Sequence, residues 1–271
     1  MPKHISNFAS VVFGAIAAKA HPKPIQSFIN RAYVKLLKLD MSDFDNPQNY
    51  KTLNALFTRS LVNKRAILED KNAVISPCDS FVTELGYIED QTLFQIKSMS
   101  YSLSSLLPHI DANLLDSFNG GKYINFYLSP RDYHRYHSPA DFRFINLTHI
   151  PGKLYPVNMP FLRNKLNLFC ENERVVIECV DRNGKRWFLV FVGALNVGKM
   201  HFNFMPDLRT NISIKDMRSF PLDLDIKIGD EIGFFEMGST IVIIAEKDAI
   251  DLTIERGTKI RFGDEIAKIS G

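Results

Sequence analysis

Short apolar segments recur between turn signals from about residue 74 onward, and this alternation restricts the fold more than any other feature of the chain. The candidate strands cover residues 123–128, 174–181, 186–194, 241–245 and 250–254. Asn183-Gly184, between two of them, is typical of a hairpin whose type I′ turn needs positive φ at both positions. We therefore predict an α+β chain in which residues 71–271 form a mostly β catalytic domain of the sandwich or barrel type.

A sequence echo near the C-terminus adds detail to this domain. The string IKIGDEIG at 226–233 returns as IRFGDEIA at 260–267. Each copy reads as a strand, a Gly-Asp turn and a second strand, which predicts two related hairpins of the lipoyl or biotinyl type around Ser239. A carrier module is the non-enzymatic alternative, but that class presents a modifiable lysine at its hairpin tip, and this chain has Gly-Ser there.

The size and cysteine content of the chain exclude a stapled mini-protein. A chain of 271 residues buries enough surface to fold as one or two domains without disulfides. Its three cysteines, Cys78, Cys170 and Cys179, match neither a disulfide framework nor a CxxC metal pattern. We expect a reducing compartment and no structural metal.

The first 39 residues carry positive charge only. Six Lys or Arg residues and no Asp or Glu fall in this stretch, whereas the whole chain has a formal net charge of +3. Such an asymmetric charge suits an anionic membrane surface or a nucleic acid. The apolar content of the same stretch favours the membrane, and we expect residues 1–70 to form a helical membrane-associating region.

Two segments support membrane contact. Residues 8–18 are almost all apolar or small but are too short to span a bilayer. Residues 25–39 place Ile25, Phe28 and Leu36 on one helical face and leave Arg31 mostly on the other, as in a helix that lies in a membrane interface. The alternatives are an ordinary helix packed on the core and a secretory signal that ends near Ala20.

A Gly-Ser pair precedes the apolar run 241–245. Gly238 leaves its carbonyl open to close approach, and the Ser239 hydroxyl stands next to that carbonyl. This arrangement suits a chain that cuts itself, although Gly-Ser before a strand is more often a simple turn.

The segment 127–139 is the richest source of a catalytic base. It brings His134 and His137 within three residues of each other, next to Arg131 and between prolines. A solvated loop and a two-histidine metal site are the alternatives, and no third metal ligand stands nearby. Asp79, in a Pro-containing turn, could orient such a base or simply form the turn.

These strings together resemble one enzyme family. YLSPRDYHRYH (127–137), SPCDS (76–80), LFCENERVV (168–176), VGALNVGK (192–199) and MGST (237–240) follow the order and spacing of the pyruvoyl-forming phosphatidylserine decarboxylase proenzymes. The similarity also takes in ALFTRSL (55–61) and PGKLYPVN (151–158) and covers the chain from about residue 40. Ser80, where a glycine is common, and Met237, where a leucine is common, depart from the pattern.

The resemblance implies a self-processing enzyme. Asp79 and His137 would activate Ser239, whose hydroxyl attacks the Gly238 carbonyl. Elimination then leaves a large β chain (1–238) and a small α chain (239–271) that stay associated. Ser239 becomes a covalent pyruvoyl group, which forms a Schiff base with the substrate in place of pyridoxal phosphate. His134 would assist decarboxylation or return the proton.

The resemblance also implies the surroundings of the enzyme. It would convert phosphatidylserine to phosphatidylethanolamine at the cytoplasmic face of the cell membrane, as a peripheral protein in phospholipid biosynthesis. It implies no metal and no nucleic acid, and it leaves a homodimer open. A Ser-His-Asp hydrolase that uses an intact Ser239 on a lipid or ester is the alternative enzyme.

Overall fold

The computed structural model describes residues 17–96, 99–195, 199–211, 216–236 and 239–271. Its helices are short: α2 (Lys23–Leu37), the 3-10 helix η1 (Pro47–Asn49), α3 (Leu53–Phe57), α4 (Leu103–Leu106), α5 (Ala112–Asp116), α6 (Met159–Asn164) and α7 (Leu168–Glu171). The strands are β1 (Ala73–Ile75), β2 (Ser80–Tyr87), β3 (Thr92–Ile96), β4 (Met99–Ser102), β5 (Lys122–Leu128), β6 (Arg135–His137), β7 (Phe142–Ile150), β8 (Arg174–Asp181), β9 (Arg186–Val192), β10 (Met200–Phe202), β11 (Arg218–Ile226), β12 (Glu231–Phe235), β13 (Ser239–Ala245), β14 (Ile250–Leu252), β15 (Lys259–Ile260) and β16 (Glu265–Ile269). The predicted mixed chain with mostly β structure is confirmed.

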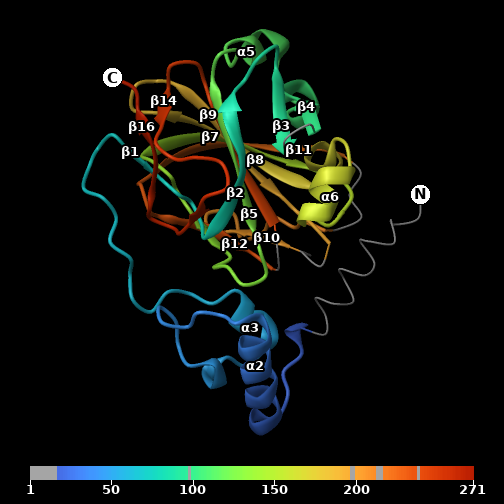
Figure 1. The fold of residues 1–271 in the computed structure, drawn as a ribbon. Coiled ribbons are helices and arrows are strands. Elements are labelled where there is room, and N and C mark those ends of the chain that lie inside the picture. Colours follow the sequence, from blue (N-terminus) through green and yellow to red (C-terminus); the bar gives the residue numbers. More distant parts are fainter. Residues whose placement is uncertain (1–16, 97–98, 196–198, 212–215, 237–238) are drawn as a thin grey trace.

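An antiparallel sheet of eight strands organises the β body (Figure 1). Its order is β11-β7-β8-β9-β13-β5-β2-β15, so β13 lies in the middle, between β9 and β5. All seven residues of β13 are buried, as expected for a continuous apolar run with many β-branched side chains. The part of the chain that the structure describes contains no closed barrel, because β11 and β15 end the sheet unpaired with each other.

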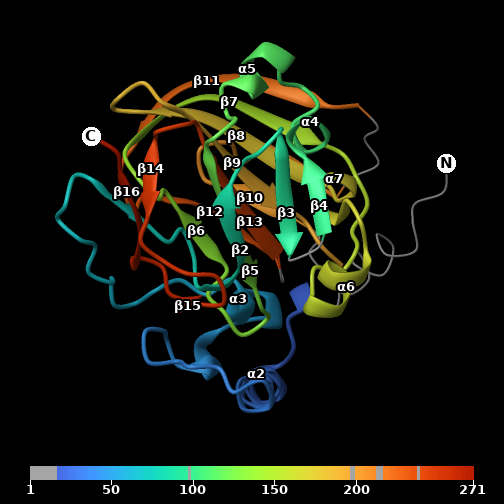
Figure 2. The same cartoon turned by 45° about the horizontal axis from the view of Figure 1, so that its top comes forward.

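A smaller sheet packs on this one through aromatic rings. Its order is β10-β12-β6, and Figure 2 shows it beside the large sheet. The ring of Tyr136 on β6 lies 4.5 Å from that of Phe191 on β9, and Phe191 lies 5.3 Å from Phe202 on β10. These contacts join the two sheets into one apolar core.

The hairpin at Asn183-Gly184 forms as predicted between β8 and β9, but the predicted turn type is wrong. Gly184 has φ of +76°, whereas Asn183 is not among the residues with positive φ. Four residues, 182–185, join the two strands, and the Asp181 carboxylate accepts the backbone N–H groups of Asn183 and Lys185. This side-chain acceptor stabilises a turn that needs a left-handed residue at the glycine alone.

The strands beside each Gly-Asp turn do not pair with each other, so the predicted lipoyl-type hairpins are wrong for the described strands. β11 pairs with β7 in the large sheet, whereas β12 pairs with β6 and β10. β15 likewise pairs with β2, and β16 pairs with β1 and β14. Gly229 and Gly263, with φ of +81° and +97°, turn the chain from one sheet into another.

Two Ser-Pro segments complete a quasi-symmetric arrangement with these corners. Ser76 N–H donates to the Asp264 carbonyl over 2.8 Å, and Ser138 N–H donates to the Asp230 carbonyl over 2.9 Å. The strand pairs β1–β16 and β2–β15 thus correspond to β6–β12 and β7–β11. The predicted repeat is real, but it extends to the SPCD and SPAD strings at 76–79 and 138–141.

The N-terminal elements lie to one side of the β body, and an extended segment before β1 returns the chain to it (Figure 1). Helix α2 buries polar side chains: Asn30 donates to the carbonyls of Pro47 and Tyr50 over 2.8 and 2.9 Å. Three of its apolar side chains are exposed, Ile25 by 52%, Phe28 by 69% and Leu36 by 79%, whereas others on the helix, such as Ile29 and Leu37, are partly buried. Within the described ranges, no helix is both long enough and apolar enough to cross a membrane. Most of the apolar segment 8–18 lies outside the described residues.

Candidate active site

Ser239 is the first residue of β13 and lies in the centre of the large sheet. Its side chain is 0% exposed, and its Oγ has no hydrogen-bond partner among the described residues. Its neighbour on β5 is Leu128, directly before the loop that carries His134 and leads into β6, whose last residue is His137. Buried hydroxyls normally have partners, and those of Ser80 and Thr240 are unpaired in the same way among the described residues. Gly238, and with it the predicted scissile bond, lies outside the described residues.

His134 is fully buried and electrically neutral. Its Nδ1–H donates to the Asp132 carbonyl over 2.8 Å, which leaves the Nε2 lone pair buried without a partner among the described residues. Burial and the nearby Arg59 charge lower the pKa of His134 to about 3. The Phe235 N–H donates to the His134 carbonyl over 3.0 Å, which brings this residue beside the segment that leads to Ser239.

His137 is also neutral, and both of its ring nitrogens are engaged. Nδ1 lies 2.9 Å from the Gly229 carbonyl, which can only accept, so the ring proton sits on Nδ1. Nε2 accepts from the Tyr133 hydroxyl over 3.1 Å. Burial lowers the pKa of His137 to about 4. The ring stacks on Phe262 with 3.7 Å between centroids.

Asp79 ends the SPCD corner and holds two partners. Both carboxylate oxygens meet the Arg65 guanidinium, with Oδ2 3.0 Å from Nη2, and Oδ1 accepts the Phe262 N–H over 2.8 Å. Arg65 also donates to Asp43 over 3.0 Å. The carboxylate is therefore fixed in place by a bidentate ion pair and a backbone donor.

The structure brings Asp79 and His137 together but only indirectly. The His137 N–H donates to the Pro77 carbonyl over 2.9 Å, and Phe262 contacts both residues. Among the described residues, no hydrogen bond joins Ser239 to His137, to Asp79 or to His134. The four predicted residues thus lie on neighbouring elements without forming a connected triad in this state.

The quasi-symmetry of the fold gives Asp79 a counterpart. Asp141 Oδ1 accepts the Ile228 N–H over 2.8 Å, just as Asp79 accepts the Phe262 N–H. The partners differ, because Asp141 meets the exposed Lys227 at 3.4 Å, whereas Asp79 meets the largely buried Arg65. The ion pair at the Asp79 corner is therefore much less exposed to solvent than the ion pair at the Asp141 corner.

Ser80 does not strain the corner after Asp79. It begins β2 and is not among the residues with positive φ, so the position does not require the glycine that is common in the family pattern.

Sequence reasoning did not identify three residues that shape this site. Tyr133 lies inside the YLSPRDYHRYH string, Arg65 lies before β1, and Arg59 follows the Phe57 whose ring packs on His134 at 4.0 Å. The sequence shows Phe57-Thr58-Arg59 as a short aromatic and basic string, but no sequence pattern links this string to residues 131–134. Only tertiary contacts make that link.

Two cavities flank the 129–132 loop. One of about 390 Å³ is lined by Arg59, Arg65 and Asp79 together with Arg131 and Lys259. The other, of about 610 Å³, is mostly apolar and is lined by Phe81, Tyr127 and Met159, and it shares Arg131 and Lys259 with the first. A polar and an apolar space thus adjoin at the same loop.

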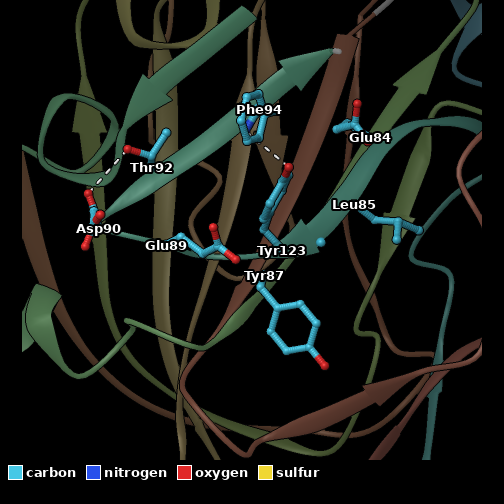
Figure 3. Close-up of a pocket in the computed structure, with 9 residues that line it drawn as sticks. Glu84, Leu85, Tyr87, Glu89, Asp90, Thr92, Phe94 and Tyr123 are labelled. Atoms are coloured by element: carbon cyan, nitrogen blue, oxygen red, sulfur yellow. Dashed lines mark hydrogen bonds between the residues drawn. The ribbon is translucent and has the colours of Figure 1, made fainter. Parts of the chain in front are cut away.

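A further surface pocket of about 480 Å³ lies at the other end of β2. Figure 3 shows its lining, in which the Tyr123 hydroxyl accepts the Phe94 N–H and Tyr87 points away from the other labelled side chains. None of the four predicted site residues lines it. The described residues contain no group of three or more His, Cys, Asp or Glu side chains that could hold a metal ion.

Comparison with known proteins gives one consistent result. The family model described as "Phosphatidylserine decarboxylase" matches residues 53–268. A Helicobacter pylori (strain Shi470) protein named "Phosphatidylserine decarboxylase proenzyme" is 44% identical over 266 residues, 97% of each chain. Proteins of the same name from Campylobacter jejuni and Nitrosospira multiformis are 43% identical (97% of this chain and 98% of that one) and 34% identical (98% and 93%).

Proposed function

The chain belongs to the phosphatidylserine decarboxylase family, and we propose that it decarboxylates phosphatidylserine to phosphatidylethanolamine after cleaving itself between Gly238 and Ser239. The buried, unpartnered Oγ of Ser239 carries this proposal. Ser80 and Thr240 also have buried, unpartnered hydroxyls, but only Ser239 directly follows a glycine, so only its Oγ stands next to a peptide bond of the predicted scissile type. A serine that serves as a precursor of a prosthetic group has a reason to remain unpaired.

Self-cleavage would use the chain's own groups. The Ser239 hydroxyl attacks the Gly238 carbonyl and forms an ester, and elimination then releases a chain that ends at Gly238. His137 would take the serine proton, because its burial keeps the imidazole neutral with a lone pair on Nε2. Asp79 would hold the corner against which His137 packs.

The Ser239 position fits a pyruvoyl group. Its surroundings are dry, and the nearest β5 neighbour, Leu128, is apolar. The carbonyl of a pyruvoyl group supplies an electron sink for the electron pair that carbon dioxide leaves behind. His134, neutral and with a free Nε2, would deliver or accept the proton at Cα of the substrate.

The two fragments would remain one molecule. Residues 239–271 contribute β13 to the middle of the large sheet, where it pairs with β5 and β9 of the other fragment. β15 and β16 pair with β2 and β1. A fragment of this size has no independent core, so its pairing with residues 1–238 would maintain the fold.

Helix α2 would bring the enzyme to its lipid. Phe28 and Leu36 project from the helix beside Lys35, and no acidic residue lies between residues 17 and 39. An exposed apolar stripe flanked by cations binds an anionic interface. We propose a peripheral protein at the cytoplasmic face of the cell membrane, with residues 1–70 as the membrane-associating region. Size-exclusion chromatography with light scattering would measure whether it forms a homodimer.

The test is whether the purified chain is cleaved between Gly238 and Ser239. Denaturing gels of purified protein are expected to separate fragments 1–238 and 239–271, and mass spectrometry is expected to find a pyruvoyl-blocked peptide that begins at position 239. Ser239→Ala should leave one intact chain without decarboxylase activity. His134→Ala should still fragment but decarboxylate poorly. An intact wild-type chain that hydrolyses esters would instead support the Ser-His-Asp hydrolase.

A further inference from the structure

Arg59 is a buried cation with too few partners. It is 2% exposed, and no ion pair joins it to a carboxylate among the described residues. Its firmest contact is the bond from Nη2 to the Arg131 carbonyl at 3.0 Å, while those to Leu56 and Asp132 are 3.5 Å long. Nε is buried without a partner among the described residues. The guanidinium also lies over the Phe44 ring, 4.4 Å from its centroid, which offsets part of the cost of burying the charge. A buried cation without a carboxylate still costs free energy unless an anion joins it.

Arg174 provides an internal comparison. It is equally buried, at 2% exposed, and it also lacks a carboxylate. Its Nε, Nη1 and Nη2 nevertheless donate to the carbonyls of Leu106, Cys170 and Ser105 over 2.8, 2.6 and 3.0 Å. Arg174 is therefore a structural arginine that ties chain segments together, whereas Arg59 retains unused donor capacity.

The unused donors of Arg59 suit an oxyanion. A guanidinium presents its N–H groups as a planar fork that matches the oxygens of a carboxylate or a phosphate. The Nε–H without a partner and the long contacts of Nη1 and Nη2 leave this fork incompletely paired among the described residues.

The surroundings supply room and charge for such an anion. Arg59 lines the cavity of about 390 Å³ together with Lys38, Arg131 and Lys259. Arg65 and Arg261 also line it, and so do five acids. Asp43 and Asp79 meet Arg65, and burial raises the pKa of Asp132. The carboxylates of Asp40 and Asp264 accept the backbone N–H groups of Ser42 and Arg261 over 3.0 and 2.8 Å.

Arg59 is also linked to the proposed proton-transfer residue. The Asp132 carbonyl accepts from His134 Nδ1 over 2.8 Å and receives the longer 3.5 Å contact from Arg59 Nη2. An anion held by Arg59 would thus lie next to the loop that fixes His134.

We propose that Arg59 binds the phosphodiester of the lipid headgroup. This rests on the proposed function. The phosphodiester keeps its charge throughout the reaction, so a cation that binds it stabilises reactant and transition state alike. A cation held on the carboxylate would instead stabilise the reactant and oppose the loss of carbon dioxide. The fork of donors on a guanidinium also matches phosphate oxygens.

The test measures binding separately from turnover. In the full-length Ser239→Ala chain, which cannot form the prosthetic group, titration calorimetry compares glycerophosphoserine, free serine and inorganic phosphate. We expect glycerophosphoserine to bind, free serine not to bind, and Arg59→Gln to weaken the binding about 10- to 100-fold, since a charge-assisted bond is lost. Arg143→Gln, which removes an exposed arginine of β7, is the charge-matched control and should bind normally.

A conservative variant keeps the proposal testable if Arg59→Gln does not fold. Arg59→Lys keeps the charge without the fork and should weaken binding at least several-fold. With Ser239 intact, the Arg59 variants should still fragment but show a raised KM for phosphatidylserine. Unchanged binding in Arg59→Lys would overturn the proposal, and equal binding of inorganic phosphate with an unchanged KM would assign the site to free phosphate. A wild-type chain that does not fragment would refute the proposed function, whereas the binding of glycerophosphoserine at Arg59 would still be measured independently.

Discussion

The Tyr133 hydroxyl donates to Nε2 of His137 over 3.1 Å, so the nitrogen that would accept the Ser239 proton is already occupied. The Gly229 carbonyl holds the ring proton on Nδ1 from the other side. The imidazole is therefore fixed in one tautomer by two neighbours, and Tyr133 has to yield, or to pass a proton on, before His137 can act on a serine.

Tyr133→Phe removes one donor from the neutral form of His137 and leaves the aromatic packing in place. The pKa of His137 should rise, because the neutral imidazole loses a hydrogen bond that the charged form does not need. We expect self-cleavage to fail at a pH higher by about 0.5 to 1 unit as the solution is acidified, since such a bond contributes about 1 kcal/mol. Cell-free synthesis at several pH values, followed on gels, measures this.

Tyr136→Phe is the matched control for that experiment. Tyr136 is equally buried, and its hydroxyl donates to the His201 carbonyl over 2.7 Å rather than to a histidine ring. It should lose stability without shifting the pH profile. Identical profiles for both variants would show that Tyr133 does not tune His137.

Buried histidines should make the protein acid-labile. Burial lowers the pKa of His137 to about 4 and that of His134 to about 3. Below the ordinary pKa of about 6.5, the unfolded chain binds protons that the folded chain does not. The stability contribution is complete above that pH and is lost as the pH falls toward 4, by about 1.4 kcal/mol per pH unit for each histidine.

Urea unfolding of the intact Ser239→Ala chain between pH 7.5 and pH 4.5 checks this. Replacing His134 by Asn should flatten the slope by one proton, because the substituted side chain does not titrate. A free energy of unfolding that stays constant over this range would contradict the burial of these rings.

Asp79 and Asp141 make the same corner contact and should differ in function. Each accepts one backbone N–H over 2.8 Å, so Asp79→Ala and Asp141→Ala remove comparable bonds of about 0.5 to 1.5 kcal/mol. Only Asp79→Ala should abolish fragmentation, because only that corner carries Arg65 and packs against His137. Gels measure the fragmentation of both variants, and thermal unfolding measures their stability. Loss of fragmentation in both variants would show that Asp79 acts only by stabilising the turn.

The apolar face of α2 should act in membrane binding and not in folding. Phe28→Ser and Leu36→Ser remove exposed side chains, so thermal unfolding should change little. Binding to vesicles that contain phosphatidylserine should weaken about tenfold or more for each, since a buried apolar side chain of this size contributes about 1.5 to 3 kcal/mol. Val62→Ser, at a residue 63% exposed outside α2, is the control and should bind as the wild type does.

Local pattern was enough to predict much of the β body. The segments around β5, β8 and β13 are apolar runs bounded by turn residues, and each forms a strand close to its predicted limits. The family resemblance followed from strings such as YLSPRDYHRYH, which are readable without any structure. The helical spacing of apolar residues in 25–39 likewise predicted helix α2.

Strand partners were not readable in the same way. The strings at 226–233 and 260–267 show a Gly-Asp turn, but a turn of that kind serves a hairpin and a corner between sheets equally well. Which of the two forms depends on distant strands: β7 and β6 take the strands of the first copy, and β2 and β1 take those of the second.

The sequence by itself determined which elements form and which residue types are available for chemistry: a Gly-Ser pair, two histidines and an aspartate. The tertiary structure alone decided what surrounds them. Arg65 reaches Asp79 across 14 positions and Arg59 reaches the Arg131 carbonyl across 72. Partners, burial and the resulting pKa shifts depend on such long-range contacts, whereas strand and helix formation depend on neighbours along the chain.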